Sequence, residues 1–369
     1  MKSTIAVIFL LYCFTVKAQS YGDATRNKLY KTAISKAESY IDSLQAKQDI
    51  PGISVCVGSK DKILWAEGFG FADLENKVRV TVNSRFRMGS VSKLLTTQAI
   101  GLLYQQGKWD LDAPIQKYLP GFPEKKYPIT SRQLAGHTAG IRHYRKGDPL
   151  SVPRRYKTVQ EGLSIFKDDS LLFKPGTAYG YSTFGYCLLS AVAEAVSHMD
   201  FLTFMRDSIF LRLGMTNTMA DYSDSIVPGR VRFYEHSKGQ LVNAALVDNS
   251  YKWAGGGFLS TPTDLVKMSE ALFNHTLLDE KTVDLLFTSQ HLENGEDIHV
   301  GIGWRINTDT KGRRIIHHGG TIDGGRTFLL LYPDEGLIVA IAANMSGVNI
   351  NITEAETLAG YFLNTLKQP

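Results

Sequence analysis

The sequence is poor in the residues that would build a metal site or a disulfide framework. Its 369 residues include three cysteines, far apart in the chain, and nine histidines scattered apart from His317-His318. There is no His-Glu-x-x-His pattern and no paired cysteine spacing, and Gly68-Phe69-Gly70 lacks the third glycine of a dinucleotide loop. We therefore expect no metal and no cofactor.

Two of the cysteines lie in apolar surroundings. Cys56 is in a strand-like run and Cys187 in a helix-like run. We interpret both as small buried hydrophobic residues, although the sequence leaves one disulfide between them open.

The sequence also lacks a strong charge imbalance and a long apolar run. Its formal net charge of +5 comes without a Lys/Arg-rich block, which argues against nucleic acid as a partner. The apolar run at residues 5–14 is too short to span a bilayer. With Lys2 before it and Val16-Lys17-Ala18 after it, this run predicts a signal peptide at residues 1–18. We expect a secreted or periplasmic protein that begins at Gln19 and has no transmembrane segment.

A Gly-x-Ser-x-Gly elbow is absent, so the sequence lacks the signature of an α/β-hydrolase. The pattern Ser-x-x-Lys occurs instead, at Ser90–Lys93, Ser59–Lys62 and Ser164–Lys167. Only Ser90 has a glycine directly before it and a long apolar helical pattern after it. Ser90 is therefore the best candidate nucleophile of the three.

On a helix, residues three apart lie on the same face, so the Lys93 amine can reach the Ser90 hydroxyl. Unpaired amide groups in the first turn would favour the negative charge that develops during attack. A serine with a base beside it suits nucleophilic catalysis. The alternative from these residues alone is a helix cap followed by a solvent-facing lysine.

The apolar spacing predicts strands at both chain ends and helices between them. We infer an α/β fold in which one antiparallel sheet, built from both ends and flanked by helices, receives an inserted, mainly helical region. The domain after the signal peptide is 19–369, with an α/β part at about 26–85 and 295–369 and a helical part at about 90–290. The predicted helices are 26–47, one that begins within 87–93 and continues through Leu103, a short one ending near Leu119, most of 129–206 with a resumption at 181–196, one ending at Leu272, and a terminal helix. The predicted strands are 53–57, 63–70, 301–306, 314–318, 327–332 and 337–342.

A basic segment interrupts the helical region at residues 142–157. It contains six cationic residues and one acid, Asp148. We favour a solvated face over a basic rim that selects acidic substrates. The cations are Arg142, Arg145, Lys146, Arg154, Arg155 and Lys157.

Two further motifs follow Ser90 in the chain. Tyr181-Ser182-Thr183 stands at a predicted helix start, and His318-Gly319-Gly320 follows a predicted strand. Ser-x-x-Lys, Tyr-x-Thr and His-x-Gly in this order resemble the serine β-lactamase and penicillin-binding protein clan, in its class C-like branch. The run at 248–261 (DNSYKWAGGGFLST) is similar to the mitochondrial β-lactamase-like serine proteases of animals. The resemblance covers about residues 50–345 and implies a β-lactamase/transpeptidase-like fold.

Roles follow from the chemistry and from this resemblance. Ser90 would be the nucleophile, Lys93 its base, and Tyr181 a proton relay to the leaving group. His318 would line the cleft and orient Tyr181 or a substrate carboxylate. The resemblance implies an oxyanion hole made by the backbone amides of Ser90 and Thr321.

Other residues of these motifs have secondary roles. Thr183 and Gly320 would bind substrate. The spacing to Gly324 selects His318 over His317, which should face the opposite side of the strand. We interpret His137 as structural, bonded to backbone, and Gly255–Gly257 as close packing beside a cleft that Tyr251 and Trp253 line.

Two departures from β-lactamases bear on the substrate. Thr183 stands where an asparagine usually grips an acylamino group, and His318 stands where a lysine usually meets the carboxylate. Both favour hydrolysis of a peptide or small ester over a β-lactam, without excluding a β-lactamase. A penicillin-binding sensor or scaffold with little turnover is the rival class. The sequence leaves self-association open.

Overall fold

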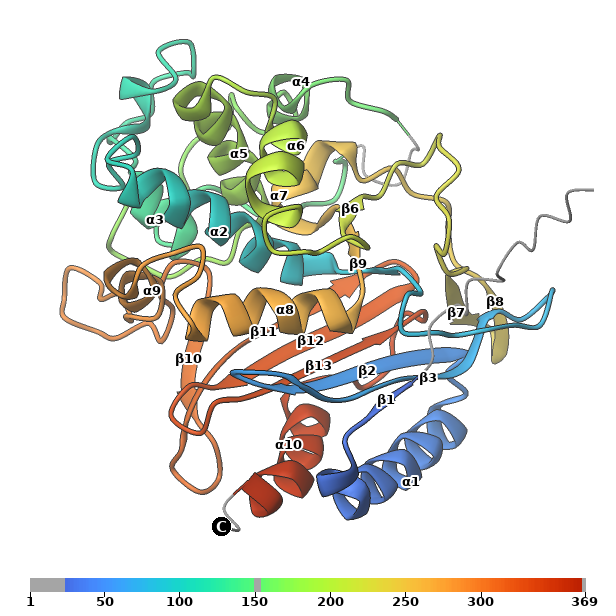
Figure 1. Ribbon diagram of the computed structural model, residues 1–369. Coiled ribbons are helices and arrows are strands. Elements are labelled where there is room, and N and C mark those ends of the chain that lie inside the picture. The colour runs from blue at the N-terminus through green and yellow to red at the C-terminus, as the bar shows by residue number, and fades with distance from the viewer. Residues whose placement is uncertain (1–23, 149–153, 367–369) are drawn as a thin grey trace, which may run out of the picture.

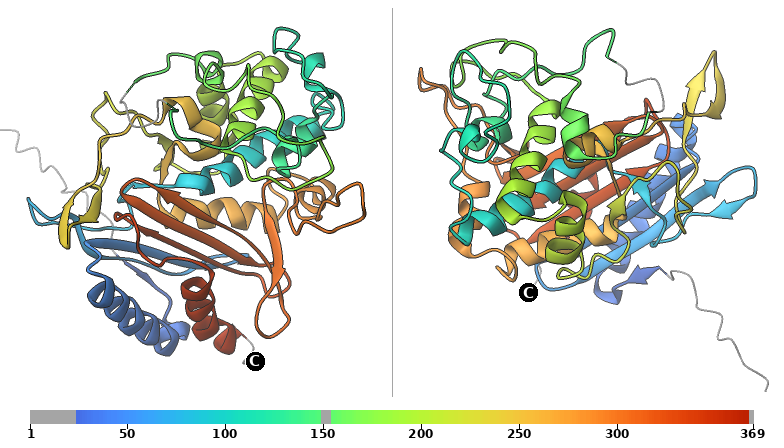
Figure 2. Two further views of the ribbon diagram at one scale, coloured as in Figure 1. Left: turned by 180° about the vertical axis from the view of Figure 1, so that it is seen from behind. Right: turned by 90° about the horizontal axis from the view of Figure 1, so that it is seen from above.

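The computed structural model describes residues 24–148 and 154–366, so the predicted signal peptide lies outside the described residues. One antiparallel sheet runs through the molecule with helices on both faces (Figures 1 and 2). The strand order is β1-β3-β2-β13-β12-β11-β10, and the short β4 pairs with β3. First and last strands of the chain thus share one sheet, which confirms the predicted fold class. The strands are β1 (Thr25–Arg26), β2 (Gly52–Ser59), β3 (Ile63–Asp73), β4 (Val78–Arg79), β10 (Arg305–Thr308), β11 (Arg314–Ile322), β12 (Gly325–Tyr332) and β13 (Leu337–Ala343).

The terminal helices cover one face of the sheet (Figure 1). They are α1 (Lys31–Gln48) and α10 (Ile352–Leu366). Phe362 of α10 stacks on Trp65 of β3, which closes an apolar core on this side. The prediction that α1 begins at 26 was wrong, because residues 25–26 pair with β3 as an edge strand, and Leu29 is 77% exposed.

The inserted region covers the other face (Figure 2). Helix α8 packs against β2 and β13, and begins with Thr261 as N-cap and Pro262 at the first turn, as predicted. The helices here are α2 (Ser92–Gln105), α3 (Ser131–Ala135), α4 (Val159–Leu163), α5 (Thr183–Ser197), α6 (Phe201–Phe204) with a π-helical turn at Met205–Phe210, α7 (Trp253–Gly256), α8 (Pro262–Phe273) and α9 (Glu280–Leu286).

Residues 129–206 are less helical than predicted, since described residues 136–148 and 164–182 are largely irregular. Helix α5 begins at Thr183 because Ser182 is extended and its Oγ accepts the Gly185 amide at 3.0 Å. The structure also contains five short strands that the sequence did not predict. Three of them form one sheet, in the order β5 (Phe86–Arg87), β9 (Phe258–Ser260) and β6 (Met219–Ala220), and β7 (Tyr234–Ser237) pairs with β8 (Gln240–Asn243).

The strand predicted at 301–306 is displaced toward the C-terminus. Residues 301–304 form a turn, in which the Gly301 amide donates to Trp304 O at 2.9 Å and Gly303 has φ +83°. Strand β10 then pairs Arg305 with His317. This shift directs Arg305 toward the site described below.

Cys56 and Cys187 are both buried and unpaired, as predicted for small apolar residues. Burial raises the pKa of the Cys187 thiol to about 12. Among the described residues no single helix is both long and apolar enough to cross a membrane. The bent pair of helices Thr183–Ser197 and Phe201–Phe210 together has the length and the apolar composition of a span.

The solvated interpretation of the basic segment is wrong for Arg142. Its guanidinium is buried and donates to Asp148 at 2.8 Å and to Asp169 at 2.5 Å. Asp169 lies outside the segment in sequence, so the local count of acids missed it. Arg145 also reaches Asp169, at 3.0 Å. These ion pairs fix the chain just before His143.

Replacing Arg142 with methionine should lower the free energy of unfolding by about 3–5 kcal/mol, because Asp148 would stay buried without its partner. Chemical denaturation measures this change. Lys146→Gln is the matched control, since Lys146 is exposed in the same segment. Equal stability of Arg142→Met and Lys146→Gln would show that the buried pairs contribute nothing.

Candidate active site

Ser90 lies in a 3-10 turn, Gly89–Val91, directly before α2. The turn is anchored on one side by the Met88 amide, which donates to Phe258 O of β9 at 3.0 Å. On the other side the Ser92 hydroxyl accepts the Phe258 amide at 3.2 Å. Gly89 has φ +49°, a left-handed conformation that favours glycine. These contacts hold the Ser90 hydroxyl at the mouth of a pocket.

Lys93 is fully buried beneath Ser90. Its amine donates to Ser90 Oγ at 3.1 Å, to Thr183 Oγ1 at 3.2 Å and to Gly255 O at 2.7 Å. No carboxylate within ion-pair distance of Lys93 occurs among the described residues. The alternative of a solvent-facing lysine is therefore wrong.

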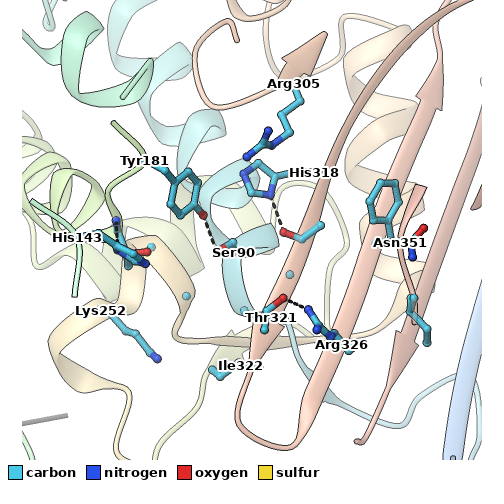
Figure 3. A pocket seen from close by; sticks show the side chains of 18 of the residues that line it. Ser90, His143, Tyr181, Lys252, Arg305, His318, Thr321, Ile322, Arg326 and Asn351 are labelled. Carbon is cyan, nitrogen blue, oxygen red and sulfur yellow. Dashed lines mark hydrogen bonds between the residues drawn. The ribbon is translucent and has the colours of Figure 1, made fainter. Parts of the chain in front are cut away.

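Tyr181 completes this group from the segment before α5. Its hydroxyl donates to Ser90 Oγ at 2.7 Å (Figure 3). Burial by itself would raise the pKa of Tyr181, but the charge of Lys93 and hydrogen bonds with Lys93 and Ser90 bring it below the usual value. A phenol of lowered pKa in contact with a serine hydroxyl is suited to proton transfer.

His318 lies on β11 and lines the same pocket, with its ring centroid 6.2 Å from that of Tyr181. Burial, followed by the charges of Lys93 and Arg305, holds the pKa of His318 well below its usual value, so the ring is neutral. Because a carbonyl can only accept, Nδ1 donates to Gly319 O at 2.6 Å and Nε2 is left as an acceptor. His317 faces away, stacked on Phe328 and bonded to Asn307, as the strand period predicts.

Close contact between β11 and the Ser90 turn depends on two glycines. A Cβ on Gly89 would lie 2.8 Å from the Thr321 amide nitrogen, and a Cβ on Gly320 would lie 2.0 Å from Met88 O. Side chains at either position would force the strand and the turn apart. The backbone of Thr321 is thereby brought beside Ser90, where the predicted oxyanion hole would be.

Two histidines position the start of α5. Nδ1 of His137 accepts the Ser182 amide, and Nδ1 of His143 accepts the Thr183 amide, each at 3.2 Å. The backbone contact of His137 confirms its structural interpretation. Burial, with smaller effects from Lys93 and Lys252, lowers the pKa of His143 to about 4. Thr183 lines the pocket, but its hydroxyl is already engaged by Lys93.

The other two Ser-x-x-Lys pairs have ordinary surroundings. Ser59 Oγ donates to the Lys62 carbonyl at 3.3 Å in a turn, and Ser164 Oγ donates to the Glu161 carbonyl at 2.6 Å. Neither serine lines the pocket that contains Ser90. The geometry therefore agrees with the choice of Ser90.

The pocket has a volume of about 500 Å³ and three cations that sequence reasoning missed. They are Lys252, Arg305 and Arg326, and none of the described residues that line the pocket is an Asp or Glu. Tyr251 and Trp253, predicted to line it, are instead buried in the core beside Lys252. Among the described residues no cluster of three His, Cys, Asp or Glu side chains could hold a metal ion.

Known proteins are similar to this chain. The family model described as Beta-lactamase matches residues 37–357. The human protein "Serine beta-lactamase-like protein LACTB, mitochondrial" is 30% identical, over 89% of this chain and 79% of its own length. The chain belongs to the beta-lactamase family. Penicillin-binding protein 4* of Bacillus subtilis (strain 168) is a further relative, 28% identical over 81% of this chain and 69% of its own length.

Solved structures of other proteins have the same fold as this member of the beta-lactamase family. The octameric penicillin-binding protein homologue from Pyrococcus abyssi matches with a TM-score of 0.78 and 24% identity, over 90% of this chain and 77% of that one. The D-stereospecific amidohydrolase from Streptomyces sp. matches with a TM-score of 0.72 and 21% identity, over 88% of this chain and 97% of that one.

Proposed function

We propose that this member of the beta-lactamase family is a serine hydrolase that forms an acyl-enzyme on Ser90. The observation that carries the proposal is the convergence of two groups on one oxygen, Tyr181 Oη at 2.7 Å and Lys93 Nζ at 3.1 Å from Ser90 Oγ. Burying an amine without an ion pair is costly. A helix cap would not need such a lysine, whereas an activated nucleophile does.

The reaction proceeds in two halves. Ser90 Oγ attacks the substrate carbonyl as its proton passes to the Tyr181 phenolate, whose oxygen is nearer to Ser90 Oγ than the Lys93 amine is. Lys93, expected from the sequence to be the base, instead stabilises the phenolate with its positive charge. The backbone amides of Ser90 and Thr321 bind the oxyanion. Tyr181 then gives the proton to the leaving group, and the acyl group stays on Ser90. Water repeats these steps in the second half, releasing the acid and regenerating the Ser90 hydroxyl.

The preferred substrate is a peptide or small ester. The Thr183 hydroxyl accepts a hydrogen bond from Lys93 and has no amide group with which to bind the acylamino group of a β-lactam. The neutral His318 does not leave this side of the pocket without a positive charge. Arg305 lies beside the same tyrosine, with Cζ 6.0 Å from the ring centroid, and supplies a cation from β10. A substrate carboxylate on this side is therefore compatible with the site.

The proposal includes export to the periplasm or the medium. This part rests only on the signal-peptide pattern of residues 1–18. N-terminal sequencing of the protein made in its host should give Gln19 or a close neighbour. An N-terminus on lipid-modified Cys13 would contradict it.

Stopped-flow assays with 4-nitrophenyl valerate test the proposal. We expect a burst of about one equivalent of nitrophenol, followed by steady turnover as the acyl-enzyme hydrolyses. A burst without turnover, for esters, L-peptides, D-peptides and a chromogenic cephalosporin alike, would instead favour a penicillin-binding sensor. No burst and no turnover with any of them would overturn the proposal.

Replacing Tyr181 with phenylalanine should lower kcat/KM for the valerate ester about 10²-fold, because the proton relay is lost. The wild-type rate should rise with pH as Tyr181 deprotonates, at a pH below the usual phenol pKa, since its pKa is lowered. Tyr181→Phe should lose this dependence. Tyr179→Phe is the control, and a pH profile in Tyr181→Phe identical to wild type would contradict the relay.

A further inference from the structure

The Ser90 pocket contains a cation that the proposed chemistry does not use. Lys252 lines the pocket between α7 and the segment that carries His143 and Tyr144. Its amine makes no hydrogen bond or ion pair with any of the described residues, although it is partly buried. Burial lowers the pKa of Lys252 to about 8, so the amine is mostly charged at neutral pH. Such a group is available to a ligand.

The Lys252 side chain lies near Gly256 and two aromatic rings. A Cβ on Gly256 would be 3.6 Å from Lys252 Cδ, which is an ordinary van der Waals contact. The amine is 5.2 Å from the Tyr251 ring centroid and 5.8 Å from that of Tyr144. Packing on both sides restricts the lysine, which lowers the entropy lost when it binds an anion.

Lys252 and Arg305 lie on different sides of Ser90 (Figure 3). Arg305 is beside Tyr181 and His318, and Tyr181 delivers a proton to the leaving group, so this side receives the leaving group. The acyl group of the substrate must extend away from the Arg305 side, toward the part of the wall formed by Lys252 and Ile322. An anion on the acyl group would meet Lys252 there. None of the described residues that line the pocket is an Asp or Glu, and Asp323, whose charge raises the pKa of Lys252, follows Ile322 in the chain and lies outside the lining.

We propose that Lys252 is a specificity-determining residue that binds a carboxylate on the acyl side of the scissile bond. The preferred substrates are then esters or peptides with a carboxylate on the acyl group, a few bonds from the carbonyl. This carboxylate is either the end of the acyl chain or part of an acidic side chain. This inference rests on the proposed acyl-enzyme at Ser90 and adds the substrate class.

Two esters of equal acyl length provide the test: mono-4-nitrophenyl glutarate, which has a terminal carboxylate, and 4-nitrophenyl valerate, which has a methyl group. Rates without enzyme are subtracted, because the glutarate carboxylate assists its own hydrolysis. We expect the glutarate-to-valerate ratio of kcat/KM to be at least about tenfold in the wild type, mainly through KM, as for a charge-assisted hydrogen bond. Lys252→Gln should lower this ratio about tenfold, and Lys252→Arg should retain most of it.

Lys36→Gln is the control, because Lys36 is exposed on α1 and far from the pocket in sequence and fold. A wild-type ratio below about threefold would overturn the inference whatever the variants do. An unchanged ratio in Lys252→Gln would overturn it too. Valerate turnover combined with no glutarate preference refutes this inference alone, whereas absence of turnover and of the nitrophenol burst refutes the proposed function.

Discussion

Replacing Ser90 with alanine should reduce kcat/KM for 4-nitrophenyl valerate by roughly 10⁴–10⁶-fold, the scale on which loss of a serine nucleophile acts. The reason is the convergence on this oxygen, with Lys93 at 3.1 Å and Tyr181 at 2.7 Å. The Thr183 hydroxyl also contacts Lys93, at 3.2 Å, but among the described residues only the Ser90 hydroxyl is bonded to both groups. Steady-state assays at high enzyme concentration measure the residual rate. Thermal unfolding of Ser90→Ala should stay near that of the wild type, since only one hydroxyl is removed.

Ser59→Ala and Ser164→Ala are the matched controls, because each removes the serine of another Ser-x-x-Lys pair. Their hydroxyls bond to nearby backbone carbonyls outside the pocket, so their activity should equal that of the wild type. Loss of activity in either control, with retention in Ser90→Ala, would refute the choice of nucleophile.

Replacing Lys93 with methionine should lower kcat/KM by roughly 10²–10⁴-fold. Methionine has a similar length but carries no charge, so the phenolate of Tyr181 would lose the cation that lowers the tyrosine's pKa. The activity that remains should therefore begin to rise at a higher pH than the activity of the wild type does. Comparison of the two pH profiles measures this shift.

The stability of Lys93→Met distinguishes a functional loss from unfolding. The Gly255 carbonyl and the Thr183 hydroxyl each lose a donor, which costs about 1–3 kcal/mol apiece, while removal of a buried unpaired charge offsets part of that cost. We expect the protein to remain folded by circular dichroism. Lys62→Met, in the exposed turn after β2, is the control. Full activity in Lys93→Met would refute the role of this lysine.

Much of the site was predictable because its motifs are local in sequence. Ser90 and Lys93 are related by one helical turn. The spacing to Gly324 selects His318, and the strand period then places His317 on the opposite side. The apolar runs of β2 and β13 likewise identify the central strands, because both faces of each are buried. The family resemblance then connects motifs that the chain places almost a hundred residues or more apart.

The misses come from irregular turns and from contacts between residues far apart in sequence. Arg305 became a pocket residue because a turn at 301–304 displaced the start of β10. Lys252 faces the pocket because the short turn around it directs Tyr251 and Trp253 into the core, an orientation that apolar spacing over so few residues does not specify. Arg142 was misjudged because its partner Asp169 lies 27 residues away. Local charge and periodicity carry no signal for such pairings.

Mass spectrometry after reaction with a fluorophosphonate tests the central claim most directly. Intact mass should show a single phosphonyl adduct per chain, and peptide mapping should place it on Ser90, with no adduct in Ser90→Ala. An adduct on Ser59, Ser164 or another residue, or no adduct on a protein that still hydrolyses the valerate ester, would contradict an acyl-enzyme on Ser90.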